Sequence, residues 1–357
     1  MKPNASTEPW LRLYLTRGVG PQLGRKLVAR FGDALWDAEP GAIARVPGVG
    51  PQTAAAIARA SAEAAQRLKT RCQALGVAIL TPSDPAWPER LEEAPGAPLV
   101  LFVAGNVEAL RAAPQLAVVG ARKALAEARR ITQRWCAALA ERGAVITSGL
   151  AYGIDAAAHE GALAAQGRTI AVIGGGLMRL MPWQQRLARR IVEAGGCVVS
   201  EHAPDVEPQP AFFPQRNRII AALADAVLVA QAGERSGALI TARLAADYGR
   251  DVWAMPGPVW SEAFAGAHRL IQEGAMLAAD VADLMRALGL EAKAAPSFTP
   301  ESDEERKVWD ALAAGPLHVD ALAHHAGLTL DALLPILLAL EMKGAIVRLP
   351  GDRYGRA

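Results

Sequence analysis

The feature that most constrains the fold is a series of short apolar segments between residues 148 and 257, almost every one of which ends in a polar loop that contains glycine. The four loops are 148–155, 174–176, 233–237 and 256–257. A parallel sheet gathers such loops at one edge, where glycine lets backbone N–H groups approach an anion and helix N termini add positive potential. The pattern therefore predicts a sheet edge that holds phosphate.

Strands and helices alternate from about residue 75 to residue 290. Apolar runs predict strands over 99–104, 116–120, 144–147, 169–173, 197–200, 226–230 and 251–255. Helical stretches lie between them, for example 125–142 and 154–166, and each of these two is followed by a glycine. Alternation of this kind predicts an α/β fold with a mostly parallel sheet covered by helices on both faces.

The first seventy or so residues contain an internal repeat. Gly18-Val19-Gly20-Pro21-Gln22 recurs as Gly48-Val49-Gly50-Pro51-Gln52, and an apolar helix is expected after each copy. The repeat resembles the helix-hairpin-helix motif, whose Gly-x-Gly turn lets backbone amides bind DNA phosphates without reading the sequence. A helical scaffold that merely keeps this turn geometry is the alternative interpretation.

Residues 291–300 are predicted to be a linker because of their composition. Beyond them, three helices (303–313, 319–326 and 329–343) and two strands around Pro350-Gly351 indicate a winged-helix domain. The third helix of such a domain ordinarily enters the major groove, yet this one has no arginine or lysine before Lys343. We therefore expect it to pack or to bind a protein rather than to read bases.

Composition and charge exclude several classes of protein. The net charge of +2 means that any nucleic-acid contact must rest on local clusters. No apolar run is long enough to span a bilayer, and the start of the chain lacks the pattern of a signal peptide. Cys72, Cys136 and Cys197 are far apart and form no Cys-x-x-Cys, which argues against a zinc site and a disulfide framework. The expectation is a cytoplasmic protein with no metal.

Motifs for catalysis and cofactors are weak. The chain has no P-loop and no Gly-x-Ser-x-Gly, and Gly174-Gly175-Gly176 lacks the third glycine of a dinucleotide fingerprint. Asp155 and His159 are one helical turn apart, as in an acid–base or metal pair. An aspartate that stabilises the helix start, with a histidine packed behind it, would look the same. We predict no cofactor and no catalytic residue.

Basic residues are placed where a phosphate edge requires them. Arg122, Arg216, Arg218 and Arg235 fall at strand ends or helix starts, and Arg243 lies two turns into a helix. They are predicted to converge on one edge of the sheet, although single arginines more often lie on a solvated face. The planar guanidinium suits phosphate because it donates two hydrogen bonds to paired oxygens.

Several long motifs occur in a recognisable order. They are 148–159, 213–220, 234–242, Pro256-Gly257 and 268–275. Together they closely resemble the DprA/Smf family, the DNA-processing proteins of bacterial natural transformation. The likeness covers the whole central segment, and longer members are expected to carry the two flanking segments as well.

The resemblance implies a Rossmann-like, doubly wound sheet in a non-enzymatic protein that binds incoming single-stranded DNA. Such a protein shields the strand from nucleases and helps to load the recombinase RecA. The predicted division is a helix-hairpin-helix or SAM-like helical domain over 1–72, a Rossmann-like DNA-binding domain over 73–290, the linker, and a winged-helix domain over 301–357. Carried over by motif, the DNA-binding residues are Arg122, Ser148, Gly149, Tyr152, Gly153, Arg216, Asn217, Arg218, Arg235, Ser236, Gly237 and Arg243.

The resemblance also implies a homodimer formed through the C-terminal part of the central domain. The predicted partner surface comprises His268, Leu270, Ile271 and Leu277. Ordinary core packing is an equally good interpretation of these apolar residues on sequence alone.

The chain departs from the family pattern at four positions. Tyr152 and Trp183 stand where a basic residue is usual, Gln215 replaces another, and Ala121 replaces a serine. Fewer charges should weaken phosphate contact, since each contact to a single strand contributes about 0.7 to the log–log salt slope. Stacking of Tyr152 and Trp183 on bases, worth about 1–3 kcal/mol each, is a hypothesis for compensation.

Two other functions stay open at this point. A Rossmann-like nucleotide hydrolase, or a sensor of a small nucleotide, could use the 174–176 loop. An interaction scaffold could recruit partners through its terminal domains.

Overall fold

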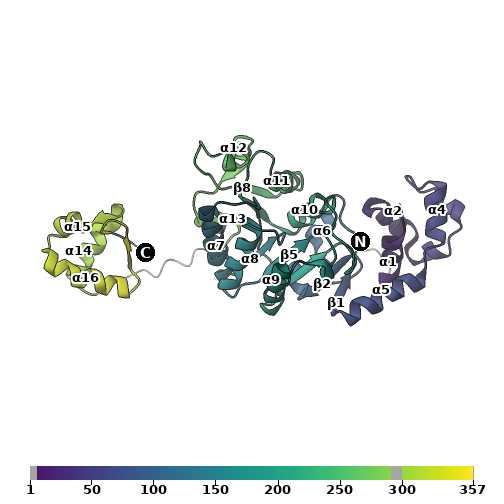
Figure 1. The fold of residues 1–357 in the computed structure, drawn as a ribbon, viewed down its shortest axis with the longest axis horizontal. Helices are drawn as coiled ribbons and strands as arrows, with labels where there is room; N and C mark the ends of the chain where they lie inside the picture. The colour runs from purple at the N-terminus through teal and green to yellow at the C-terminus, as the bar shows by residue number, and fades with distance from the viewer. Residues whose placement is uncertain (1–5, 291–299, 357) are drawn as a thin grey trace. The chain divides into compact units, whose positions relative to one another are not determined.

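The computed structural model describes residues 6–290 and 300–356. The chain divides into two compact units, Met1–Glu291 and Ala292–Ala357 (Figure 1). The predicted linker falls, apart from its last residue, outside the described residues.

A nine-stranded sheet forms the centre of the larger unit, in the order β1-β2-β6-β5-β4-β3-β7-β8-β9. Every neighbouring pair from β6 to β9 is parallel, whereas β2 is antiparallel to β6 and β1 is antiparallel to β2. The strands are β1 (Val77–Leu80), β2 (Leu101–Gly105), β3 (Gln115–Gly120), β4 (Val145–Ser148), β5 (Thr169–Ile173), β6 (Cys197–Ser200), β7 (Ala226–Gln231), β8 (Asp251–Ala254) and β9 (Met276–Leu277). The predicted mostly parallel sheet is confirmed, and the short outer strands β1 and β9 are additions to it.

Helices cover both faces of this sheet (Figure 1). They are α6 (Glu89–Glu93), α7 (Ala126–Glu141), α8 (Ile154–Ala164), α9 (Pro182–Glu193), α10 (Phe212–Leu223), α11 (Ala238–Asp247), α12 (Ala265–Gln272) and α13 (Val281–Ala287). Short 3₁₀ turns lie between some of them, namely η2 (Val107–Arg111), η3 (Leu177–Arg179) and η4 (Glu262–Phe264).

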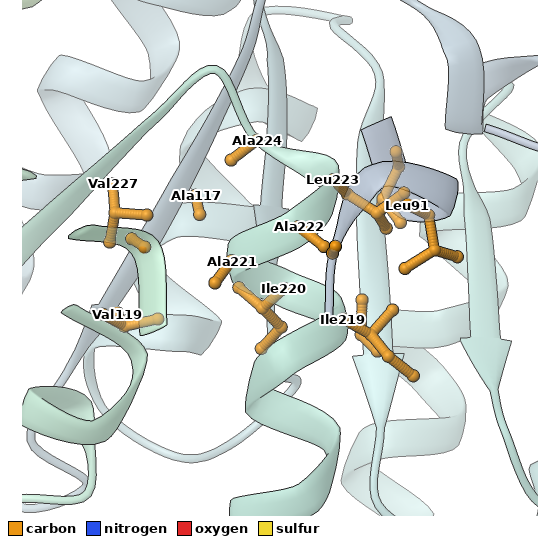
Figure 2. Close-up of a cluster of buried hydrophobic side chains, with 14 of the residues drawn as sticks. Leu91, Ala117, Val119, Ile219, Ile220, Ala221, Ala222, Leu223, Ala224 and Val227 are labelled. Carbon is orange, nitrogen blue, oxygen red and sulfur yellow. The ribbon is translucent and has the colours of Figure 1, made fainter. Parts of the chain in front are cut away.

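Side chains of the central strands alternate between two hydrophobic clusters. Ala117 and Val119 of β3 pack with α10 and α11 on one face, while Leu116 and Val118 pack with α7 and α8 on the other. This alternation follows from the two-residue period of a strand. Figure 2 shows the first cluster, in which residues 219–223 of α10 and the following Ala224 lie beside Ala117, Val119 and Val227.

Six helical segments precede the sheet: α1 (Thr7–Leu15), α2 (Pro21–Phe31), η1 (Gly32–Trp36), α3 (Pro40–Ala44), α4 (Pro51–Ala58) and α5 (Ala62–Ala74). The two copies of the repeat have matching geometry, because Gly18 and Gly48 both have positive φ (84° and 98°) and Pro21 and Pro51 both begin a helix. Whether this turn contacts DNA stays a prediction.

The N-terminal helices share a core with the sheet. Trp10, Leu11 and Leu13 belong to the same buried cluster as Phe102 of β2, and the Tyr14 ring lies 5.5 Å from the Phe102 ring. Burial raises the pKa of Tyr14 to about 12, and its hydroxyl accepts a hydrogen bond from the Ala203 amide at 2.8 Å. The division predicted at residue 72 therefore crosses continuous packing, and it stays a prediction about folding units.

The smaller unit has the arrangement of a winged helix. Its elements are α14 (Asp303–Ala311), η5 (Leu312–Ala314), β10 (Leu317–His318), α15 (Val319–Ala326), α16 (Leu330–Met342), β11 (Ile346–Leu349) and β12 (Arg353–Arg356). The strands form a sheet in the order β10-β12-β11. One side of α16 leaves Leu334, Leu338 and Met342 exposed at intervals of four residues, while Leu333, Leu337 and Leu340 are buried.

The described residues contain no single helix that is both long and apolar enough to cross a membrane; α15 and α16 meet that test only when joined across a bend of 103°.

Phe102 offers a test of the shared core. We expect Phe102→Ala to lower the free energy of unfolding by about 3–5 kcal/mol, because the substitution removes a fully buried ring that both the sheet and the N-terminal helices contact. Phe102→Leu retains much of the volume and is expected to lose about half as much or less. Urea unfolding measures both values, and equal losses for the two variants would contradict the assigned packing.

Candidate nucleic-acid interface

The predicted loops do meet at one edge of the sheet. Strands β5, β4, β3 and β7 are neighbours, so the segments that follow them lie side by side at their carboxyl ends. The chain moves from β3 to β4 in one direction and later places β7 on the other side of β3, which makes the β3–β7 boundary a topological switch point. Open α/β sheets bind ligands at such points.

A cavity of about 760 Å³ lies at this switch point, and we call it the central cavity. Its walls come from the loop after β3, the loop after β7 and the first turns of α10 and α11. A smaller cavity of about 210 Å³, here called the stack cavity, adjoins it at the ends of β4 and β5. Arg122, Ala151, Phe213 and Arg216 line both cavities.

Three of the predicted arginines share the central cavity. Arg122 and Arg235 are exposed and come from opposite sides of the switch point. The guanidinium carbon of Arg122 lies 5.3 Å from the centre of the Phe213 ring. Neither side chain forms an ion pair within the described residues. Two guanidinium groups are therefore available to an anionic ligand.

Arg216, the third of these arginines, is buried beneath the other two. Its Nη2 donates a hydrogen bond of 2.8 Å to the carbonyl oxygen of Gly149, and only 8% of the residue is exposed. A Cβ on Gly149 would lie 1.8 Å from Arg216 Nη1, so the guanidinium occupies the space that any other residue would need. Burial lowers the pKa of Arg216 to about 10, which leaves it charged at neutral pH.

Asp155 completes this arrangement. Its Oδ2 accepts hydrogen bonds from the backbone amides of Gly149 (3.2 Å) and Ala151 (3.4 Å). Burial raises the pKa of Asp155, while the Arg216 charge and these amides oppose the rise. The carboxylate and the guanidinium thus hold the 149–155 loop from two sides.

Ser148 and Gly153 fix the backbone around the 149–155 loop. The Ser148 hydroxyl is fully buried and donates to the Val118 carbonyl at 2.6 Å, so it joins β4 to β3 and does not reach the surface. Gly153 has a φ of 86°, and a Cβ there would lie 2.3 Å from the Ala121 carbonyl oxygen. Glycine is required at this position by both the dihedral angle and the close approach.

Tyr152 and Trp183 stack on each other beside the stack cavity. Their ring centres are 4.0 Å apart with an angle of 28° between the planes, and Tyr152 is 57% exposed. The two aromatic departures from the family pattern therefore form one exposed platform.

Asn217, Ser236 and Gly237 line the wall of the central cavity beside α11. Asn217 Nδ2 donates to the Gly237 carbonyl oxygen at 3.4 Å, and the Ser236 hydroxyl accepts from the Ala238 amide at 3.3 Å. Phe213 lines both cavities but was not predicted as a site residue. Its position in the 213–218 motif could have identified it.

Two of the predicted arginines, Arg218 and Arg243, do not line the central cavity with the others. Arg218 pairs with Glu201 at 2.5 Å in a separate cavity of about 450 Å³, which Gln215 also lines. The reason is helical geometry: residues two apart on α10 face different directions, so Arg216 and Arg218 cannot share a cavity. Arg243 is exposed on α11 and lines neither the central nor the stack cavity. The predicted convergence is corrected to Arg122, Arg216 and Arg235.

The three consecutive glycines after β5 allow neighbouring segments of the chain to pack closely against this loop. A Cβ on Gly176 would lie 2.3 Å from the Pro204 carbonyl oxygen, and one on Gly175 would lie 2.9 Å from Pro208 Cβ. The Gly176 amide donates to the Val206 carbonyl at 2.8 Å, so it is not directed at a ligand.

Asp155 and His159 do not act as a pair. His159 Nδ1 lies 2.7 Å from the Thr169 hydroxyl, which itself donates to the Ile146 carbonyl at 2.5 Å. Burial, reinforced by the Arg216 charge, lowers the pKa of His159 to about 3. Within the described ranges no three His, Cys, Asp or Glu side chains are grouped so that they could hold a metal ion.

Residues of the predicted partner surface separate into core and surface. Leu270 is buried in the sheet cluster, and His268 Nε2 lies 3.0 Å from the Gly257 carbonyl oxygen. Ile271 is half-buried, whereas Leu277 and its neighbour Met276 are exposed on β9, the outermost strand. The available apolar surface is therefore narrower than predicted, because α12 turns Leu270 toward the core.

Comparison with known proteins gives two family matches. The family described as DNA recombination-mediator protein A matches residues 78–289, and the DprA winged helix domain matches residues 291–352. Protein Smf from Escherichia coli is 39% identical over 284 residues, which cover 76% of each chain. Protein Smf from Synechocystis is 33% identical over 99% of both chains.

Two solved structures are also similar. DNA processing protein A from Streptococcus pneumoniae superposes with a TM-score of 0.70 at 34% identity, covering 79% of this chain and 98% of that one. DNA processing protein A from Helicobacter pylori, whose structure concerns its single-stranded DNA binding mode, superposes with a TM-score of 0.54 at 27% identity, covering 59% and 95%.

Gly149 and Gly237 provide a matched pair of substitutions at this edge. Gly149→Ala should lower the free energy of unfolding by about 1–3 kcal/mol, because its methyl group displaces the buried Arg216 guanidinium. Gly237→Ala should change it by about 0.5 kcal/mol or less, since nothing lies within 4 Å of the new Cβ. Chemical denaturation measures both, and the reverse order would contradict the placement of Arg216.

His159 should make stability depend on pH. The folded state keeps this histidine neutral down to a pKa of about 3, whereas the unfolded chain binds a proton near about pH 6.5. As pH falls from about 6.5 toward 4.5, the free energy of unfolding of the wild type should fall by about 1.4 kcal/mol per pH unit because of this group. Above about pH 6.5 the histidine is neutral in both states, so this loss is absent. His159→Gln should remove this slope in urea titrations at several pH values; an unchanged slope would show that the histidine is protonated when folded.

Proposed function

We propose a function for this chain on the basis of its family, because it belongs to the DprA/Smf family of DNA recombination-mediator proteins. It binds single-stranded DNA across the central and stack cavities through the phosphate backbone. In the cell it covers incoming strands against nucleases and hands them to a RecA-type recombinase.

The observation that carries this proposal is the arrangement of charge at the switch point. Arg122 and Arg235 have no ion pair within the described residues and lie on two sides of one cavity, which the buried Arg216 also lines. Guanidinium groups bind phosphate oxygens with paired hydrogen bonds. The net charge of the whole chain is only +2, so this local cluster, not overall charge, must attract the polyanion.

A single strand fits this edge better than a duplex. The Tyr152–Trp183 platform lies at the margin of the stack cavity and offers an exposed ring face. Bases of a single strand are free to stack on such a ring, whereas bases of a duplex are enclosed. None of these contacts reads base edges, so binding is expected to tolerate any sequence.

We also propose that the protein is not an enzyme and acts as a cytoplasmic homodimer. The Asp155 carboxylate is engaged by two backbone amides and the Arg216 charge, which leaves it in a structural role. The exposed apolar pair Met276 and Leu277 on the outermost strand is the candidate contact between protomers. The three free, buried cysteines agree with a reducing compartment.

Removing the exposed charges of the central cavity tests the binding mode. Arg122→Ala and Arg235→Ala should each weaken binding to oligo-dT and reduce the log–log salt slope by about 0.7, because each removes one phosphate contact. Arg168→Ala is the matched control, since this exposed arginine precedes β5 at the opposite edge of the sheet. Fluorescence anisotropy across a salt series measures the slopes, with duplex dA–dT as competitor.

Two outcomes would count against the proposal. An equal effect of Arg168→Ala would mean that general charge rather than the central cavity binds the strand. Preference for the duplex would contradict the single-strand assignment.

A further inference from the structure

A third cavity, of about 520 Å³, lies between helices α7, α8 and α9, and we call it the three-helix groove. The three helices lie next to one another on the sheet (Figure 1). Each contributes residues spaced by three, four and seven positions, which is one face of a helix. The lining comprises residues 126, 129, 130 and 133 of α7, residues 153, 156, 157 and 160 at α8, residues 183, 186, 187 and 190 of α9, and Tyr152 just before α8.

The groove has a small-residue floor and basic walls. Gly153, Ala156 and Ala157 lie along the α8 side, where short side chains leave room for a ligand. The walls carry four exposed arginines, Arg129 and Arg130 from α7 and Arg186 and Arg190 from α9. Within the described lining, Glu160 is the carboxylate that faces them.

Some arginines on other helices are balanced by a carboxylate one turn away. Arg12, Arg67 and Arg269 each pair with a glutamate four residues away. None of the four groove arginines has an ion pair within the described residues. Arg186 and Arg190 are themselves four apart, a spacing at which like charges destabilise a helix by about 0.2–0.5 kcal/mol. Four such arginines gathered around one groove indicate a site for an external anion.

The three-helix groove adjoins the stack cavity. Tyr152 and Trp183 line both the stack cavity and the groove, so their stacked rings stand at the junction. The stack cavity in turn shares Arg122 and Arg216 with the central cavity. A strand that crosses the central cavity therefore meets an aromatic platform and then a second set of arginines.

We propose that the three-helix groove binds the phosphates of the same DNA single strand as it leaves the sheet edge past Tyr152 and Trp183. This inference rests on the function proposed above and extends the site by a second segment. Arg186 and Arg190 are four residues apart, about 6 Å along the helix axis, so they can contact phosphates in succession. Charges distributed over two walls suit a polyanion rather than one small nucleotide.

The test uses oligo-dT of two lengths, since sites of this kind occupy about 4–16 nucleotides. With a strand of about 25 nucleotides, long enough to exceed a single site of that size, Arg186→Ala/Arg190→Ala should reduce the salt slope by about 1.4 and weaken binding tenfold or more at low salt. With a strand of about 6 nucleotides, which fills the central cavity alone, the same variant should bind as the wild type does. Glu160→Gln should tighten binding of the longer strand only.

Arg134→Ala/Arg189→Ala is the matched control. Both residues are exposed, lie on α7 and α9, and carry the same charge, but neither lines the groove. All five substituted side chains, the control pair included, are exposed. The variants are therefore expected to fold as the wild type does, which circular dichroism checks.

The outcomes separate this inference from the proposed function. If the groove pair and the control pair bind the long strand equally well, or if the groove pair also loses the short strand, the extension is overturned. In either case the effect of Arg122→Ala and Arg235→Ala on the short strand still decides the proposed function by itself. Loss of the long strand alone, confined to the groove pair, supports the extension.

Discussion

The buried guanidinium of Arg216 is the contact on which the sheet edge depends. It fills the space beside Gly149, donates to that residue's carbonyl oxygen and offsets the buried Asp155 charge. Removing either group would leave the other charge buried without this compensation, which is destabilising. The 149–155 loop is held in one conformation by this pair, and Gly153 then lets the loop after β3 approach it closely. The exposed Arg122 and Arg235 are thus presented by loops whose shape is set from below.

Two kinds of arginine follow from this arrangement. Those that face Glu or Asp, such as Arg218 with Glu201, are satisfied inside the chain and contribute to packing between elements. Arg122 and Arg235 at the central cavity and the four arginines of the three-helix groove have no ion pair among the described residues, so they are available to an external anion. A nearly neutral protein can in this way concentrate positive potential along one path.

Much of the fold could be predicted from sequence, because β-branched and apolar runs such as 169–173, 197–200 and 226–230 leave few alternatives to buried parallel strands. The strands β1 and β9 were missed since they are only four and two residues long and lie at the sheet edges. The meeting of the loops after β3, β4 and β7 was also predictable. Which arginine would be buried was not, because sequence alone treats every arginine as a surface residue. The separation of Arg216 from Arg218 required the orientation of α10, and the groove required knowing that α7, α8 and α9 are neighbours.

The three cysteines determine how the folded chain responds to oxidants and electrophiles. Cys72 in α5, Cys136 in α7 and Cys197 in β6 are all buried, and burial raises the pKa of each thiol, to about 11 for Cys72 and about 12 for Cys197. Oxidants and electrophiles attack the thiolate, which these side chains do not form at neutral pH. Peroxide, disulfide exchange and alkylating agents are therefore expected to leave these three buried sulfhydryls unmodified while the chain is folded.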